Sequence, residues 1–320
     1  MDVKSLLGGA LLALAVAAPA TAQNFPNRPV TLLVSTAPGS GMTVTARLIA
    51  GELEKIWKQT VTVDFRGGAG GYIAAEVTMQ QPADGYYLLY GSNAFTAIRL
   101  FAKGNTFNPA TDLTPISYAI SQPFVILTNP KVPAKDVKEF IALAKANPGK
   151  LNFGVIGRSQ QTLEVLRFSA LAGIKMEEVA YQATAAVMPA LMTNDLQMYL
   201  GGVASQGPMV KEGRLVALAT MDDKRADYLP DVKTLKEQGI NQNALFWYGI
   251  WGPPKMDPAL ANRIAADIKT ALSVPTLKDT LEKQQYYNVA PNTPAQFKAL
   301  LETEMKIYAD VAKANNIQPE

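Results

Sequence analysis

The chain carries the run Pro29-Val-Thr-Leu-Leu-Val34 followed directly by Ser35-Thr-Ala-Pro-Gly-Ser-Gly41, and this pattern recurs along its length. Residues 29–34 are apolar and partly β-branched, which is typical of a buried strand. A polar loop with two glycines comes next, and apolar residues then recur at helical spacing from Val44 to Trp57. A strand, a glycine loop and a helix in this order predict a mainly parallel α/β sheet.

The same order continues through the sequence. In the first half we expect strands at 60–64 and 86–90, with a short helix at 72–80 between them. In the second half we expect helices at 137–146, at 163–172 and after Thr184, and strands at 122–128, 151–154, 178–181, 198–200, 215–219 and 246–252.

The end of the chain is mostly helical. We expect helices at 257–272, 275–284 and 294–314, and because no strands accompany them, they should pack back on the first sheet. A chain of 320 residues is about twice the size of a typical domain. The length therefore favours two domains over one very large one.

The composition excludes several kinds of chemistry. There is no His and no Cys, so a Ser-His-Asp triad, a Cys nucleophile, a Cys/His zinc site and a disulfide framework are all impossible. Hydrophobic residues make up 48% and charged residues 18%, which indicates a folded, soluble globular protein. The formal charge of +3 is too small to argue for nucleic-acid binding.

The first 22 residues have the features of a secretory signal peptide. Lys4 is followed by an uncharged apolar run over 6–18, and the small residues Ala20 and Ala22 suit cleavage before Gln23. The apolar run is short for a membrane span, so an uncleaved anchor is the less favoured alternative. We therefore expect export to a bacterial periplasm, where a chain without Cys has no thiol to mispair.

Four polar loops each follow a predicted strand and precede a helix, which is where parallel sheets bind ligands. Their candidate binding residues are Pro38, Gly39, Ser40, Gly41, Met42 and Thr43; Ser92 and Asn93; Arg158, Ser159, Gln160 and Thr162; and Gln182, Ala183 and Thr184. Glycine lets the backbone approach a ligand, hydroxyls add donors, and free amides at a helix start favour an anion such as a carboxylate. Any single loop is better explained by helix caps and turns than by ligand binding. Four loops, two from each half, favour a shared cleft, to which we add Gly202 and Trp247.

Familiar nucleotide and hydrolase motifs are missing. The sequence has no Walker A motif, and the glycines at 67–71 fail the dinucleotide pattern because Ile73 occupies its last glycine position, so this stretch is interpreted as a turn. It also has no Gly-x-Ser-x-Gly elbow and no Ser-x-x-Lys pair. We therefore predict a protein that is not an enzyme and that uses no metal and no cofactor.

An ordered set of motifs resembles the substrate-binding proteins of tripartite tricarboxylate transporters, the TctC or Bug-type family. The set includes Phe25-Pro-Asn-Arg-Pro-Val-Thr-Leu-Leu-Val34, Arg66-Gly-Gly-Ala-Gly-Gly71, Ala83-Asp-Gly-Tyr86, Asn152-Phe-Gly154, Leu229-Pro-Asp-Val232 and Trp247-Tyr-Gly249 with Gly252-Pro-Pro254. The resemblance covers nearly all of the chain after residue 22.

The resemblance implies a type II periplasmic binding protein, an α/β fold with two domains joined by a two-strand hinge and a ligand cleft between them. Carried over by position, domain 1 would comprise 23–121 and 249–320, and domain 2 would comprise 122–248. The four loops would hold one carboxylate of a small organic acid through amides, hydroxyls and bridging waters. A monomer would close around this ligand and deliver it to integral membrane transporter subunits.

The sequence leaves the ligand open among di- or tricarboxylates and aromatic carboxylates. Many relatives carry Gly where Ser40 stands and Asp where Thr43 stands, so recognition of an amino group is not expected here. Arg158 is either a contact for a second carboxylate or an exposed loop charge, and Trp247 and Tyr248 are either ligand-stacking or core residues. A receptor that signals to a membrane sensor kinase is the alternative function, and a periplasmic enzyme is the less favoured one.

Overall fold

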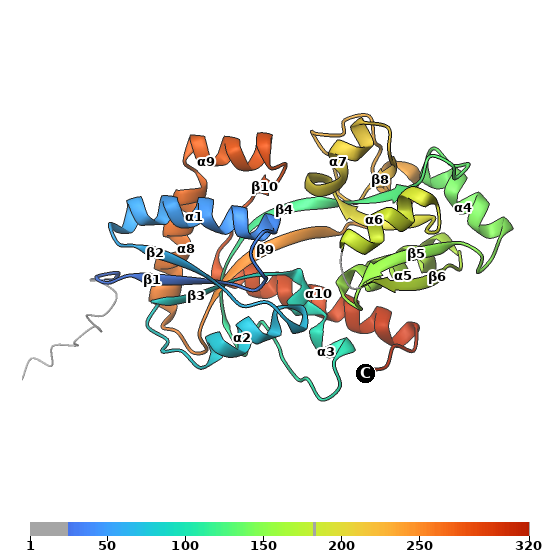
Figure 1. Ribbon diagram of the computed structural model, residues 1–320. Coiled ribbons are helices and arrows are strands. Elements are labelled where there is room, and N and C mark those ends of the chain that lie inside the picture. The colour runs from blue at the N-terminus through green and yellow to red at the C-terminus, as the bar shows by residue number, and fades with distance from the viewer. Residues whose placement is uncertain (1–24, 182–183, 320) are drawn as a thin grey trace, which may run out of the picture.

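The computed structural model describes residues 25–181 and 184–319, which form two α/β halves side by side (Figure 1). The predicted signal peptide and the candidates Gln182 and Ala183 lie outside the described residues. None of the helices in 25–181 and 184–319 is long and apolar enough to cross a membrane.

The first half is built around β1 (Val30–Val34), which pairs in parallel with β2 (Val61–Phe65) on one side and β3 (Tyr87–Ser92) on the other. Helices α1 (Gly41–Trp57) and α2 (Tyr72–Met79) connect these strands. Because all three strands are parallel, their carboxyl ends meet at one edge of the sheet. The loops that follow them are therefore neighbours in space.

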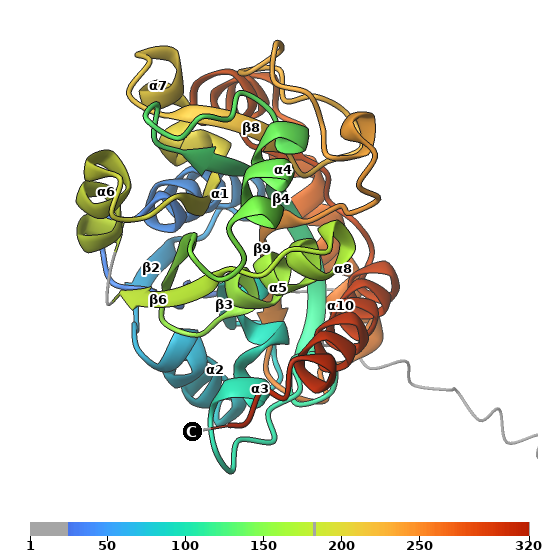
Figure 2. The same ribbon diagram turned by 90° about the vertical axis from the view of Figure 1, so that its right-hand side faces the viewer.

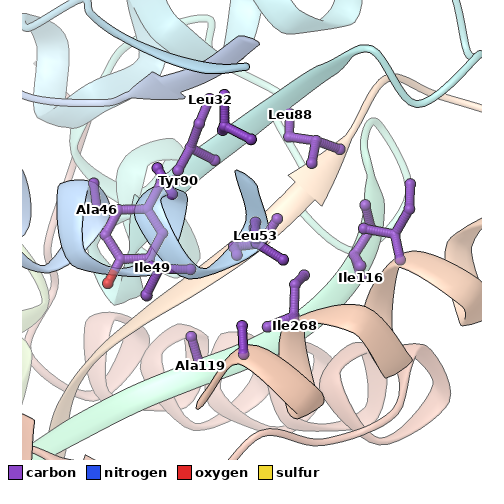
Figure 3. Packing of buried hydrophobic residues seen from close by; sticks show 14 of the residues in the cluster. Leu32, Ala46, Ile49, Leu53, Leu88, Tyr90, Ile116, Ala119 and Ile268 are labelled. Atoms are coloured by element: carbon purple, nitrogen blue, oxygen red, sulfur yellow. The ribbon is translucent and has the colours of Figure 1, made fainter. Parts of the chain in front are cut away.

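Apolar side chains fill the space between this sheet and its helices (Figure 3). Leu32 of β1, Ile49 of α1 and Ile268 of α8 (Pro258–Leu272) are completely buried in one cluster. Each such side chain contributes about 1.5–3 kcal/mol by leaving water. This packing holds α1, and with it the loop before α1, in a fixed position on the sheet.

The long strand β4 (Thr114–Thr128) belongs to both halves. Its residues 114–123 pair with β9 (Leu245–Gly252), and β10 (Asn288–Val289) pairs with its residues 120–121. Its last residues pair instead with β7 (Met198–Gly202) and β8 (Val216–Thr220). The predicted strand began only at residue 122. The predicted domain boundaries after 121 and after 248 fall inside β4 and β9, and the division itself stays a prediction.

The second half repeats the first in outline. Its central strand β5 (Asn152–Ile156) pairs in parallel with β6 (Glu177–Tyr181) and with β7. Its helices are α4 (Val137–Ala146), α5 (Gln160–Ala172), α6 (Thr184–Thr193) and α7 (Val203–Lys211). Short elements complete the chain: η1 (Ala69–Gly71), η2 (Asn93–Thr96), α3 (Ile98–Phe101), η3 (Lys236–Gln238), α9 (Pro275–Asp279) and η4 (Thr280–Gln284).

The last helix, α10 (Pro294–Ala314), differs from expectation because it contacts both halves. Phe297 packs under the first sheet as predicted, but Tyr308 and Ala312 pack against Leu163 of α5. Figures 1 and 2 both place α10 beside α5. A helix of 21 residues is long enough, at 1.5 Å per residue, to reach past the first sheet.

Candidate ligand-binding site

A cavity of about 690 Å³ lies at the edge where β1, β2 and β3 end. Its lining consists of Ser35, Thr36, Ala37, Ser40, Met42, Gly67, Gly68, Gly70, Gly71, Ser92, Phe246 and Tyr248. None of these residues carries a charge. The cavity therefore offers amides, hydroxyls and aromatic faces to a ligand.

The N-terminus of α1 forms one wall of the cavity. Ser40 caps the helix, since its Oγ accepts a hydrogen bond from the Thr43 amide at 3.4 Å. The Thr43 hydroxyl reaches back to the carbonyl oxygen of Ala37 at 3.5 Å, and Thr43 itself is buried. The first amides of a helix have no partner inside it, and the helix dipole adds about half a positive charge at this end. This wall suits an anion.

The loop after β2 forms another wall of the cavity, and two of its positions favour glycine. Gly71 has a φ of +96°, and a Cβ atom added to it would lie 2.7 Å from the Phe95 ring and 3.1 Å from Cβ of Ser35. Gly68 has a φ of +119°. Interpreting 67–71 as a simple turn missed its place in the site. The signal was available, because this loop also follows a parallel strand.

Phe246 and Tyr248 of β9 line the cavity, and Trp247 does not. Successive side chains of a strand point to opposite faces, so Trp247 faces the other way. It is 1% exposed, and its indole N–H donates to Oε1 of Glu304 at 2.7 Å. In this structure Trp247 is a core residue, and the same alternation identifies Phe246 as a lining residue.

Tyrosine hydroxyls cluster below the cavity. The Tyr287 hydroxyl donates to the Tyr248 hydroxyl at 3.4 Å, and a Cβ atom on Gly41 would lie 3.0 Å from the Tyr287 hydroxyl. Nearby, the hydroxyls of Tyr90 and Thr45 are 3.1 Å apart. Burial raises the pKa of Tyr248 well above its usual value and also raises the pKa of Tyr287. These groups therefore stay neutral and act as hydrogen-bonding groups.

Ser92 and Asn93 have different surroundings although they are adjacent. Ser92 lines the cavity, and its Oγ accepts from the Ala94 amide at 3.3 Å. Asn93 is fully buried and donates from Nδ2 to the carbonyl oxygen of Leu245 at 3.0 Å. Its Oδ1 accepts from Nε2 of Gln160 at 3.3 Å. Asn93 and Gln160 thus connect the two halves beside the cavity.

The described candidates Arg158, Ser159, Thr162 and Gly202 of the second half do not line this cavity. Arg158 lies near the surface with its Nε 3.4 Å from Oε1 of Glu178. The Ser159 amide donates to Oγ1 of Thr162 at 3.4 Å, and Thr162 is buried. The Gly202 amide donates to Oε1 of Gln206 at 2.9 Å. Thr184 is the first residue of α6.

A separate cavity of about 450 Å³ lies behind β9, between α5 and α10, and two glutamates line it. Glu164 of α5 is buried and accepts from Nε2 of Gln242 at 2.7 Å. Glu304 of α10 is partly buried as a residue, but desolvation of its carboxyl group raises the pKa to about 8. Desolvation also raises the pKa of Glu164. Across 25–181 and 184–319, no three acidic side chains gather as they would around a metal ion.

Comparisons with known proteins agree with this architecture. The family model described as "Tripartite tricarboxylate transporter family receptor" matches residues 45–316. A protein of Cupriavidus necator, described as "UPF0065 protein in gbd 5'region", is 31% identical over 301 residues, which is 90% of this chain and 91% of that protein.

Two solved structures from Rhodopseudomonas palustris are similar over nearly their whole length. One, solved with adipate, has a TM-score of 0.80 at 25% identity and covers 92% of this chain and 100% of that chain. The other, MatC with bound malate, has a TM-score of 0.75 at 25% identity and covers 90% and 99%. The predicted binding-protein fold is confirmed. The matched family and neighbours are solute-binding proteins and not enzymes.

Proposed function

The chain belongs to the tripartite tricarboxylate transporter receptor family, and we propose that it captures a small organic carboxylate in the periplasm and delivers it to a membrane transporter of that type. The observation that carries the proposal is the uncharged cavity at the ends of β1, β2 and β3. The adipate and malate in the two similar structures support a carboxylate as the ligand.

The ligand carboxylate would lie between the start of α1 and the glycine loop 67–71. Amides of residues 39–42 and hydroxyls such as those of Ser40 and Ser92 would donate to it. Micromolar affinity corresponds to about 8 kcal/mol. Charge-assisted hydrogen bonds contribute roughly 1.5–3 kcal/mol each, against an association cost of about 4 kcal/mol or more. Four to six such bonds are sufficient by this estimate, so the first carboxylate needs no cation.

The rest of the ligand would lie against Phe246 and Tyr248, which suits an aliphatic dicarboxylate or an aromatic carboxylate. Hinge closure, with domain 1 as 23–121 plus 249–320 and domain 2 as 122–248, would bring the second-half loops over it. In this closed form, residues 158–162, Gly202 and the loop 182–184 would complete the site, and Arg158 would meet a second carboxylate. Ligand contacts from both domains would favour this closed form over the open one.

We propose export through the signal peptide 1–22, with cleavage before Gln23, and action as a monomer. The apolar run 6–18 and the small residues before position 23 support this cleavage site. Mass spectrometry of the protein secreted to the periplasm would give its N-terminal residue. An intact residue 1 on the mature protein contradicts the cleavage.

A thermal-shift panel tests carboxylate capture. Adipate, malate and benzoate are added to the purified protein over a range of concentrations, and the melting temperature should rise with the concentration of the true ligand class. The diamide of adipic acid is the matched control, because it keeps the shape and loses the charge. Melting temperatures that no acid moves would refute the proposal. Uptake of the acid by proteoliposomes that contain the transporter subunits tests delivery.

A further inference from the structure

A third cavity, of about 430 Å³, lies between the halves and is lined by residues of both. Here Tyr228 of the second half, from the loop after β8, stacks on Tyr286 of the first half, from the segment before β10. The ring centroids are 3.7 Å apart and the planes are tilted by 28°. Pro123 of β4 lines the same cavity, so the stack lies beside the shared strand.

Helix α7 supports the stack from the second half. Nζ of Lys211 lies 3.7 Å from the centroid of the Tyr228 ring, and since Tyr286 covers one face, the ammonium group occupies the other. A Cβ atom on Gly207 would lie 2.7 Å from the same ring. Tyr228 is therefore held against the backbone of α7, and its position follows that of the second half.

Tyr286 has an unusual backbone conformation. Its φ is +56°, in the left-handed region that bulky side chains rarely adopt. Such conformations persist where the surroundings hold them. Here the amides of Gln285 and Tyr287 donate to Thr280 and Leu281, and the Tyr228 ring covers the side chain. The next residue, Tyr287, is buried, and its hydroxyl donates to that of Tyr248, which lines the ligand cavity. Adjacent rings thus contact the other half and the floor of the site.

We propose that Tyr286 is a positioning residue, which through its stack on Tyr228 contributes to the angle between the halves in the ligand-free protein and keeps the Tyr287 hydroxyl against Tyr248 and Gly41. Ligand affinity then depends on a ring contact that lies outside the ligand cavity. This inference rests on the proposed function, because it assumes that the acid binds in that cavity.

The absence of Cys allows the angle between the halves to be measured directly. Spin labels are attached to K269C on α8 and K138C on α4, two exposed positions in different halves, and their distance distribution is recorded without ligand. Y228L and Y286L should each broaden this distribution. Each should also weaken binding of the acid at least fivefold, and the double variant should bind no more weakly than either single variant.

Y86L is the matched control. Tyr86 packs edge-on to Phe25 and lies under the Arg28 guanidinium, 3.8 Å away, but all of these residues are in the first half. It should change neither readout. Y286F keeps the stacked ring and removes only the hydroxyl contact with Tyr228, so it should stay closer to the wild type than Y286L in both readouts. This comparison guards against a general folding defect in Y286L.

Affinity within twofold of the wild type and an unchanged distance distribution in both Leu variants would overturn the inference. If no acid binds the wild-type protein, the proposed function fails separately. The distance distribution without ligand still decides whether the stack sets the angle.

Discussion

The loops at the ends of the parallel strands differ between the two halves. In the first half, glycines and short hydroxyl side chains leave donors facing an open cavity. In the second half, long amide side chains use the corresponding donors: Gln206 accepts from the Gly202 amide, and Gln122 accepts from the Ala204 amide at 2.7 Å. The edge of a parallel sheet thus makes a site possible, and the neighbouring side chains determine which donors remain for a ligand.

The glycine loop of the first half should be sensitive to an added side chain. G71A should lower the free energy of unfolding by roughly 2–4 kcal/mol, because the added Cβ meets Phe95 and Ser35 at a positive φ. It should also abolish the ligand-induced rise in melting temperature. The second half offers a matched control in Gly213, which has a φ of +70° and no atom within 4 Å of its added Cβ. G213A should cost about 1 kcal/mol and leave binding unchanged, and equal losses in the two variants would contradict this account.

The contact between α5 and α10 joins the halves and should respond to pH. Glu304 has a folded pKa of about 8 against an ordinary value of 4.5, so the folded state holds a proton that the unfolded state has released between these values. The contribution of Glu304 to stability should therefore be greatest below about pH 4.5 and should be lost as the pH rises to 8. The raised pKa of Glu164 acts in the same direction.

Urea unfolding at pH 5, 7 and 9 measures this loss. We expect roughly 2–4 kcal/mol, less than the full shift implies because solvent reaches part of Glu304. E304Q should reduce the loss of stability between pH 5 and pH 9, because an amide does not titrate. The amide oxygen can still accept from the Trp247 indole, so the packing should be kept. K306Q, on the same helix but exposed, is the control. If the unfolding free energies of E304Q and the wild type change with pH in parallel, this carboxyl group is not the origin of the pH dependence.

Gln206 tests whether the second half satisfies its own donors. Q206M removes the oxygen that accepts from Gly202 and should lower the unfolding free energy by about 1 kcal/mol, as expected for a partly buried amide left unpaired. Chemical denaturation gives this value. An unchanged denaturation midpoint would mean that the Gly202 amide finds another partner and that the contrast between the halves is smaller than described.

Arg158 should give the smallest effect on stability. Its pair with Glu178 is partly exposed, so R158Q should change the unfolding free energy by less than about 0.5 kcal/mol. Calorimetric titration should show weaker binding of a dicarboxylate and unchanged binding of a monocarboxylate. Equal changes for both acids would remove Arg158 as the contact for a second carboxylate.

Much of the fold followed from periodicity. The helix at 137–146 matches α4, and β1, β2 and β3 are within two residues of their predicted ends. The short strand β10 among the C-terminal helices was not predicted. The first eight residues of β4 were missed because this strand is buried on both faces and lacks the alternation that marks a half-exposed strand. Pro115 and Ser117 also interrupt its apolar run.

The site was only partly predictable. Ser40, Met42 and Ser92 line the cavity because loops after parallel strands gather at one edge. The glycine loop lines it for the same reason, but it was compared with a nucleotide motif instead of being placed by that rule. The hydrogen bond from the Ala204 amide to the Gln122 side chain could not be predicted. These residues are 82 positions apart, and no local pattern links them.

One further consequence follows from β4, which is hydrogen-bonded to strands of both sheets without a break in the chain. Neither lobe can melt while the other keeps its full complement of backbone bonds, because they share the same strand. Heating the protein should therefore produce a single cooperative calorimetric peak, in spite of its two-lobed outline.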